Sequence, residues 1–460
     1  MDERASIRQW AELNFRAASL GDPRRTQRLV LSATRIAARP GCTFPQVFDW
    51  NQLRAFYNLC DQESVHLASV QQPHWQRTRQ AMRQQPLVLI LHDTTELDFT
   101  THTSLKGAGP IGDGGGSGFL QHNSLAVLPR PRQVLGLAYQ QWQVRQPAPA
   151  RERSPGRKRR DRESQLWAKG IAAPGAAPEG CCWVDVGDRG SDIYEAMVAA
   201  RDQGHHFLFR LTQNRQVFAA AEQEELVGLR DYARSLPSRG QDVVEIPGRG
   251  GRAGRTATVR LAGAPVWVPA PTETPDRWRQ PIVGAWVIRV WEADAPAGAQ
   301  PLEWQLLCSL PTTTLAELKE RRDWYGCRWL IEVYHDVAKN GCAEEGRRFE
   351  TAGRMEACLA LLSVVAVRVL QLRLAAENQP EAPAEQVATA EEIELVRRLT
   401  KQRGRVTVRG FVHGVAKLGG FLGRKGDGNP GVRTLWRGYQ RLQDMLLGFQ
   451  LHPNSPPDSG

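Results

Sequence analysis

Three acidic side chains stand where separate apolar segments of the chain end or pack. Asp93 follows the apolar run 86–91, Asp188 follows the short segment 182–187, and Glu332 lies in a helical pattern much further along the chain. Carboxylate oxygens are the ligands that Mg²⁺ and Mn²⁺ prefer. Two such ions about 3.5–4 Å apart can activate an attacking oxygen and stabilise a leaving one in phosphoryl transfer. We therefore predict that these three acids form a site for a pair of divalent cations.

Glu332 belongs to a polar row on a predicted helix over residues 323–341. The apolar residues of this helix recur in steps of three and four: Trp324, Cys327, Ile331, Tyr334 and Ala338. One position further on, polar residues repeat the same steps: Tyr325, Arg328, Glu332, His335 and Lys339. Because a helix turns about 100° per residue, this polar row lies beside the buried face and not opposite it. Partial burial of the row predicts a charged partner, although Arg328 and Glu332 alone would also suit a surface pair worth about 0.3–0.5 kcal/mol.

Other acids near the two strand ends compete for the same role. Glu96 and Asp98 follow Asp93, while Asp185 and Asp192 flank Asp188. The Thr-rich surroundings of Asp98 favour a turn, and Asp192 is predicted in the first turn of a helix, where an acid complements the dipole. A lone acid at a strand end is more often a cap than a catalytic group, and nothing in the sequence excludes these rivals.

The segments that must position these acids form a mixed pattern of strands and helices. Apolar runs at 86–99, 119–129 and 133–145 predict an antiparallel meander that opens a mixed sheet. Residues 181–212 predict a strand, a turn, a helix and a further strand, the unit whose strand ends hold the sites of open α/β sheets. Several β-rich runs between about 240 and 310 separate this sheet from the acid-bearing helix, and we interpret them as an insertion.

The two ends of the chain are predicted to be helical, and the first end carries clustered arginines. In the segment GDPRRTQRL, Asp22 suits a helix cap and Pro23 the first helical position. Arg24, Arg25 and Arg28 then fall in the first turns, where the helix dipole disfavours cations. These arginines therefore predict another partner, of which phosphate is the obvious one.

The amino-acid composition favours some classes of protein and argues against others. The 460 residues carry a net charge of +11, which favours a polyanionic partner but is weak evidence alone. The basic run 151–160 suits either a phosphate-contacting loop or a solubilising one. No run of about 18 apolar residues and no apolar leader is evident, which argues against a membrane span and a signal peptide. The eight scattered cysteines contain no CxxC pair, so we expect reduced thiols in the cytoplasm and no zinc site.

The spacing of the polar row resembles a known signature. Tyr325, two residues, Arg328, three residues, Glu332, six residues and Lys339 match the Y-(2)-R-(3)-E-(6)-K pattern of bacterial cut-and-paste DDE transposases of the insertion sequence 4 family. Four further blocks resemble that family in the same order: SLGDPRRTQRL, HDTTELDF, GDRGSDIY and AKLGGFLGRKGDG. The resemblance covers most of the chain, and no signature position departs from the pattern.

The resemblance implies a fold and a division into domains. It implies an α/β (mixed) chain whose RNase H-like catalytic core is interrupted by a β-strand insertion. Residues 1–70 would form a helical DNA-binding domain and residues 376–460 a helical dimerisation domain. Residues 71–375 would form the catalytic domain, with the insertion at about 215–310.

The same resemblance implies roles for particular residues. Asp93, Asp188 and Glu332 would be catalytic and bind two Mg²⁺ ions, with Mn²⁺ as a substitute. The side chains expected to contact DNA are Tyr325, Arg328, Lys339, Trp304, Arg24, Arg25 and Arg28. Trp304 matches the position on which a flipped base stacks, worth roughly 1–3 kcal/mol, although a strand tryptophan taken alone is more often a core residue. His335 lies outside the signature, as a space-filler or, less readily, a phosphate contact.

The implied activity is DNA transposition. A homodimer would bind terminal inverted repeats, nick them, form and open hairpin ends and join the ends to target DNA, in the cytoplasm of a bacterium in association with the nucleoid. Two alternatives remain open at this point. One is an RNase H-like endonuclease without strand transfer, and the other is a non-catalytic DNA-binding repressor derived from a transposase.

Overall fold

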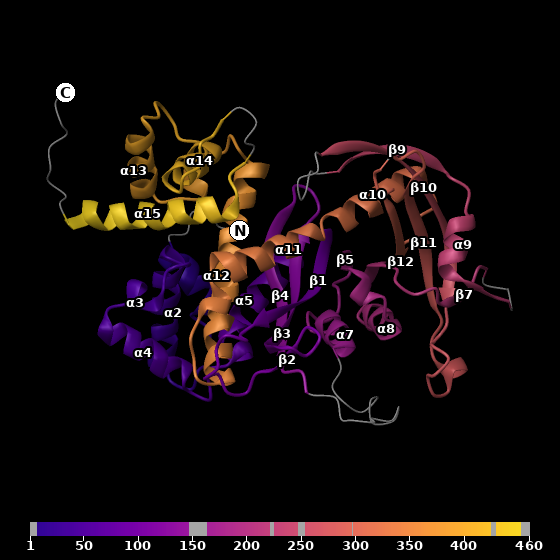
Figure 1. Cartoon of the computed structure of the whole chain (residues 1–460), viewed down its shortest axis with the longest axis horizontal. Helices are drawn as coiled ribbons and strands as arrows, with labels where there is room; N and C mark the ends of the chain where they lie inside the picture. The colour runs from indigo at the N-terminus through magenta and orange to yellow at the C-terminus, as the bar shows by residue number, and fades with distance from the viewer. Residues whose placement is uncertain are drawn as a thin grey trace.

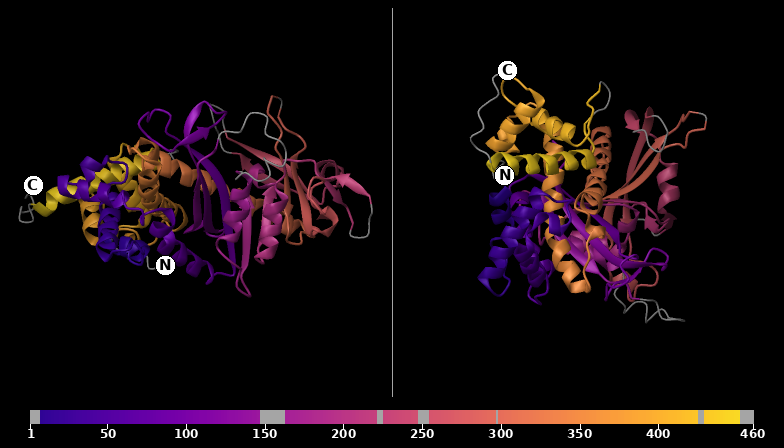
Figure 2. Two further views of the ribbon diagram at one scale, coloured as in Figure 1. Left: turned by 90° about the horizontal axis from the view of Figure 1, so that it is seen from below. Right: turned by 60° about the vertical axis from the view of Figure 1, so that its left-hand side comes forward.

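The computed structural model shows a long mixed sheet with helices gathered at one end and a β-rich region at the other (Figure 1). The structure describes residues 7–146, 163–220, 225–246, 254–296, 298–424 and 429–451. The basic run 151–160, for which the sequence leaves two interpretations, lies outside the described residues. Figure 2 shows the N-terminal and C-terminal helices side by side at the same end of the molecule. The predicted mixed α/β architecture with helical ends is therefore confirmed.

The N-terminal region consists of short helices that pack on one another. They are α1 (Ile7–Phe15), α2 (Pro23–Ala38), α3 (Phe44–Val47), α4 (Trp50–Cys60) and α5 (Leu67–Met82). Asp22 caps α2 as predicted, because its carboxylate accepts a hydrogen bond from the backbone N–H of Arg24 at 2.8 Å. The last helix of the group, α5, packs against the sheet and so connects this region to the core.

The sheet is built around two parallel neighbours, β1 (Leu87–Asp98) and β5 (Cys182–Gly187). On one side, β1 pairs antiparallel with β3 (Gly116–Leu128), which pairs with β4 (Gln133–Gln143), so the predicted meander is confirmed. The short strand β2 (Gly109–Ile111) adds to the edge. On the other side, β5 pairs in parallel with β6 (His206–Arg210). The central acids thus lie in the middle of a sheet and not at its edge.

The strands of the predicted insertion extend this same sheet. They are β7 (Gln216–Phe218), β8 (Leu226–Gly228), β9 (Gly240–Ile246), β10 (Arg255–Val268), β11 (Val283–Glu292) and β12 (Glu303–Cys308). Because β12 pairs antiparallel with β6, with Leu307 opposite Phe209, the inserted strands continue the core sheet directly. The order is β2-β3-β1-β5-β6-β12-β11-β10-β7-β8, with β4 on β3 and β9 on β10, twelve strands among the described residues. The insertion also contains the short helix α9 (Leu229–Ser235).

The remaining helices cover the sheet and form the C-terminal region. They are α7 (Ser164–Ala172), α8 (Tyr194–Asp202), α10 (Leu315–Gly326), α11 (Trp329–Asp336), α12 (Ala352–Asn378), α13 (Ala390–Thr400), α14 (Val408–Leu418) and α15 (Val432–Leu451). Within the described ranges α12 alone is long and apolar enough to cross a membrane, with a mean hydropathy of 1.9 over its most apolar window. Because 78% of that window is buried inside the protein, core packing accounts for its composition.

The single helix predicted over 323–341 is wrong in its continuity. Helix α10 ends at Gly326, α11 begins at Trp329, and a π-helical turn, η3 (Val337–Gly341), follows. The break is a tight turn in which the N–H groups of Leu330 and Ile331 bond three residues back, to Cys327 and Arg328. The backbone stays near helical geometry there, so the apolar face remains continuous, and all five residues predicted for it are buried. This is why the spacing gave no sign of the break.

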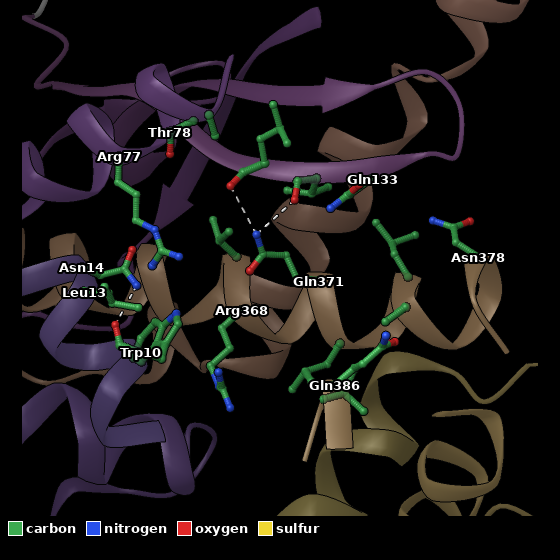
Figure 3. Close-up of a pocket in the computed structure, with 18 of the residues that line it drawn as sticks. Trp10, Leu13, Asn14, Arg77, Thr78, Gln133, Arg368, Gln371, Asn378 and Gln386 are labelled. Atoms are coloured by element: carbon green, nitrogen blue, oxygen red, sulfur yellow. Dashed lines mark hydrogen bonds between the residues drawn. The ribbon is translucent and has the colours of Figure 1, made fainter. Parts of the chain in front are cut away.

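The N-terminal helices, the sheet and the long helix α12 meet around a cavity of about 150 Å³ (Figure 3). The Gln371 amide of α12 points to the start of β4 and donates hydrogen bonds to the carbonyl oxygens of Val134 and Leu135 at 3.0 and 3.3 Å. On the opposite wall, the Asn14 amide donates to the carbonyl oxygen of Trp10 at 2.7 Å. Gln371 thus joins α12 to the sheet, and Oδ1 of Asn14 lies 2.7 Å from Nδ1 of His74, which joins α1 to α5.

Candidate active site

Asp93 and Asp188 lie side by side because of the register of two parallel strands. The last pair of residues that β1 and β5 share is His92 opposite Gly187. Asp93 and Asp188 are the next residues on strands that lie about 4.8 Å apart, so their side chains point to the same face of the sheet. The Asp188 carboxylate also caps the following turn by accepting a hydrogen bond from the N–H of Gly190 at 2.8 Å. The structure therefore brings two of the three predicted acids together.

Glu332 reaches the same place from α11, which packs on β1. The Arg328 guanidinium bridges the two elements: its Nη1 lies 3.7 Å from Oδ2 of Asp93, and its Nη2 donates to the Glu332 carboxylate. The side chain of Asp93 is only 17% exposed and that of Glu332 33%. Arg328 and Glu332 therefore form a partly buried pair beside Asp93 and not an isolated surface pair.

The surroundings of Asp93 change the pKa of its carboxyl. Burial raises the pKa of the Asp93 carboxyl to about 7, and the neighbouring charges of Asp188 and Glu332 add to this effect. The Arg328 charge and a hydrogen bond from the N–H of Thr94 at 2.9 Å act in the opposite direction and do not compensate. A buried carboxylate repelled by two others favours binding of a cation.

The donor set fits a divalent cation in type, but the side chains are not arranged as a finished metal cage. Among the residues that the structure describes, no group of three or more His, Cys, Asp or Glu side chains converges closely enough to hold a metal ion. The positive charge that bridges Asp93 and Glu332 here is the guanidinium of Arg328. A divalent cation bound by these acids would have to release Glu332 from Arg328.

The polar row lies beside the buried face, as its spacing predicts. The Tyr325 hydroxyl is buried without a hydrogen-bond partner in the described part of the chain. Its ring lies 6.0 Å from that of Trp304 on β12, which is half-buried at the edge of the core. An unpaired buried hydroxyl costs about 1–3 kcal/mol, so this atom is suited to a ligand. Lys339, on η3, donates to the carbonyl oxygen of Glu96 at the end of β1.

The structure separates the rival acids from this site. Asp185 is fully buried on the opposite face of the sheet and accepts from His92 and His205 at 2.8 and 3.0 Å. The other three also have local partners: Arg215 and the Thr212 N–H for Asp192, Arg145 for Glu96, and Thr100 for Asp98. Asp98 is the turn residue that its surroundings predict, whereas Asp192 lies before α8 and not in its first turn. Their partners account for all four.

The N-terminal arginines lie apart from the acids and differ among themselves. Arg24 is 88% exposed and pairs with Asp22. Arg25 instead supports the fold, because its guanidinium donates to the carbonyl oxygen of Leu20 and to the side chains of Ser64 and Gln62. Arg28 is half-buried on the same helix.

The sequence did not reveal one group of cations and one further arginine. A groove of about 1150 Å³ along α2 is lined partly by Arg8, Arg16, Arg35 and Arg39. Arg210 ends β6 one residue beyond Phe209, which pairs with Gly187, so it lies next to Asp188 at the carboxyl ends of two neighbouring parallel strands. The spacing of Arg35 and Arg39 along one face of a helix, and the arginine that ends the run HHFLFR, were the available signals.

The fold and site define a mixed α/β core with clustered carboxylates and cations, between two helical regions. Each helical region matches a protein-family model. Residues 7–65 match the model of the transposase DNA-binding domain, and residues 364–452 match the Tn5 transposase dimerisation domain. Neither of these two matches covers the strands that carry Asp93 and Asp188. Together they support a DNA transposase of the Tn5 type with DNA as a partner and a dimeric assembly.

Proposed function

We propose that this protein is a DNA-cleaving and DNA-joining transposase of the insertion sequence 4 family, with Asp93, Asp188 and Glu332 as its catalytic residues. The observation that carries the proposal is the placement of Asp93 beside Asp188 on neighbouring parallel strands, with Arg328 bridging Asp93 and Glu332. In keeping with this, burial and the charges of the other two acids raise the pKa of the Asp93 carboxyl to about 7. Structural acids elsewhere in the sheet are satisfied by their neighbours, whereas this one is left to an external cation. The flanking DNA-binding and dimerisation matches supply the substrate class.

The three carboxylates would hold two divalent cations, Mg²⁺ or Mn²⁺, which when bound would polarise the phosphate and activate the attacking oxygen. The residues of the polar row would bind the phosphates of the transposon end. Arg328 would turn from Glu332 to a phosphate oxygen, and the unpaired Tyr325 hydroxyl would donate to another. Lys339 would add charge at the end of β1, and Trp304 would stack on a flipped base.

The proposed reaction is a series of in-line phosphoryl transfers at this one site. Water attacks the phosphate at the element's end and frees a 3′-hydroxyl, which attacks the opposite strand and forms a hairpin. A second water opens the hairpin, and the 3′-hydroxyl then attacks target DNA. Each step exchanges one P–O bond for another, so the same charged residues serve all four. The exposed Arg24 and the half-buried Arg28 would contact the terminal inverted repeats. The protein would act as a homodimer, in association with the nucleoid in the cytoplasm of a bacterium.

A cleavage and joining assay tests the proposal. A supercoiled plasmid would carry the DNA that flanks the gene on both sides, and would be incubated with the protein, Mg²⁺ and a second plasmid as target. The expected products are nicked plasmid, hairpin ends and joined molecules. Nicked DNA without hairpins or joined product would instead establish the endonuclease. Binding without any cleavage would establish the repressor.

A further inference from the structure

A second set of buried polar side chains, which we call the amide row, runs from α5 through β4 and β3 to His335, beside Asp93. Asp93 and two members of the row lie opposite one another on neighbouring strands: Asp93 on β1 faces Asn123 on β3, which faces Gln140 on β4. The row continues to Gln71 and Trp75 of α5 on one side, and to His335 of α11 on the other. Asn123, Gln140 and Gln71 are fully buried. Polar groups in such a place are held by their partners and by no solvent.

The hydrogen bonds of this row all run in one direction. An indole N–H can only donate, so Trp75 donates to Oε1 of Gln71 at 3.0 Å. This leaves the Gln71 amide N–H groups to donate to Oε1 of Gln140 at 2.7 Å and to the Ala360 carbonyl oxygen at 2.8 Å. Because a carbonyl oxygen only accepts, the second bond fixes the Gln71 amide independently. Gln140 then donates to Oδ1 of Asn123 at 2.6 Å.

The direction of the row determines which nitrogen of His335 carries the proton. The Asn123 amide nitrogen lies 3.0 Å from Nε2 of His335, and as a donor it requires that nitrogen to accept. The proton of the neutral ring is therefore on Nδ1, which lies 4.0 Å from Oδ2 of Asp93. A ring whose Nε2 accepts cannot be protonated on both nitrogens, so the same contact makes the ring neutral. His335 thus presents an N–H group to Asp93 without adding a charge.

We propose that His335 is a positioning residue for Asp93. Its Nδ1–H tautomer is set by the amide row, which begins at Trp75 and ends at Asn123. Its N–H group would close on the Asp93 carboxylate and orient it toward a bound cation, and this role rests on the proposed function. Hydrogen-bond partners of ligating carboxylates affect metal affinity by about 10–100-fold when removed. The role differs from both earlier interpretations of His335. A residue that only fills space would not depend on one tautomer. A phosphate contact would need an N–H group that faces DNA, whereas Nε2 faces Asn123 and Nδ1 faces Asp93.

The tautomer can be measured in the unmodified protein without any ligand. Long-range ¹H–¹⁵N correlation spectra distinguish a protonated Nδ1 from a protonated Nε2, and the signal that disappears in His335→Asn identifies the ring. We expect the Nδ1–H form. A protonated Nε2 would overturn the proposal, because the amide row could not then be oriented as described.

Two substitutions at 335 separate positioning from packing. His335→Asn keeps an N–H donor at the δ position toward Asp93, whereas His335→Leu fills the space without a donor. Mn²⁺ affinity, followed by electron paramagnetic resonance on the full-length protein, should fall about 10–100-fold in His335→Leu and stay within about threefold of wild type in His335→Asn. Equal affinities for wild type and His335→Leu would overturn the role of His335 alone. A wild-type protein that binds no Mn²⁺ would overturn the proposed function.

A change at Gln140 tests the row itself. In Gln140→Glu the carboxylate still accepts from Gln71 but cannot donate to Asn123, so the Asn123 amide must turn over. Its oxygen would then face Nε2 of His335, and the tautomer should change to Nε2–H with a loss of Mn²⁺ affinity like that of His335→Leu. An unchanged tautomer in the folded variant would contradict the proposal. Thermal unfolding checks that the variant is folded, and if it is not, the wild-type spectrum decides.

Discussion

The two faces of the strand pair β1–β5 each bury an acid, and the acids behave in opposite ways. Asp185 is fully buried, yet its pKa is lowered, because the charge and hydrogen bonds of His205 and the hydrogen bond of His92 outweigh the effect of burial. On the other face, burial and the charge of Asp188 raise the pKa of Asp93 to about 7. Its nearest side-chain nitrogens stand further off, with Nη1 of Arg328 at 3.7 Å and Nδ1 of the neutral His335 ring at 4.0 Å.

This difference shows that burial alone does not determine the direction in which the pKa of an acid is changed. What separates the two is whether the surrounding protein supplies enough donors. Asp185 has two ring nitrogens within hydrogen-bond distance, so it belongs to the structure of the sheet. Asp93 has one backbone N–H and two neighbouring carboxylates, so its charge is left for an external partner. The substitutions below test this contrast, beginning with the largest expected effect.

Replacing the unsatisfied acid should abolish activity and spare the fold. In Asp93→Asn we expect the rate of Mg²⁺-dependent plasmid cleavage to fall about 10³-fold or more, because the transition state loses several kcal/mol of stabilisation. Binding to the flanking DNA should persist in gel-shift measurements. Asp98→Asn is the matched control, because that acid lies on the same strand and only caps a turn. Cleavage by Asp93→Asn at the wild-type rate would sink the catalytic assignment.

Replacing the satisfied acid should have the opposite outcome. Asp185→Asn removes the charge that two buried histidines share, and breaking such a buried pair costs about 3–5 kcal/mol. We expect the free energy of unfolding, measured by urea denaturation, to fall by this amount. Activity per folded molecule should change little. A variant that is stable but inactive would place Asp185 in the reaction and remove the distinction between the two faces.

The pH dependence of stability should differ in sign between the two acids. The pKa of Asp93 is higher in the folded protein than its ordinary value of 3.8, so ionisation destabilises the fold. As pH rises from about 4 to about 7, this carboxyl should lower the free energy of unfolding by up to about 4 kcal/mol. Asp185, with its lowered pKa, contributes stability above its unfolded pKa that is lost as pH falls through the folded one.

Urea denaturation in chelator, at pH 4 and pH 7.5, measures the effect of Asp93. Asp93→Asn should match wild type at pH 4 and exceed it at pH 7.5. The deficit of Asp185→Asn should be the same at these two pH values and shrink only below the ordinary pKa of 3.8, as pH falls through the lowered folded pKa. A constant difference between Asp93→Asn and wild type across this range would show that Asp93 is not destabilised by its neighbours.

The smallest effect is expected at Lys339, at the edge of the hydrated face. Lys339→Ala should reduce the slope of log K against log salt for DNA binding by about one unit. Nitrocellulose filter binding at several salt concentrations gives this slope. A slope equal to that of wild type would leave Lys339 with only its structural contacts to Glu96 and Glu345.

The sequence predicted the parts of this site that depend on local pattern. Apolar runs located β1 and β5, and helical spacing placed Glu332 beside a buried face. It could not choose between Asp185 and Asp188, because the choice depends on His205, which the fold brings in from the next strand. The amide row was equally hidden, since Gln71 and Gln140 meet only through tertiary packing. The break at Cys327 was missed because the apolar steps continue through it.

The continuity of α12 has a consequence for the assembled complex. The helix runs unbroken from Ala352, beside Lys106, to Asn378, and the dimerisation match begins at residue 364, near its midpoint. At 1.5 Å per residue it is a rod of about 40 Å, and most of it is buried. In a dimer joined through this region, such a rigid helix would set the distance between the two proposed active sites. We therefore expect duplications of the target DNA to have one fixed length, and variable lengths would argue against a rigid connection.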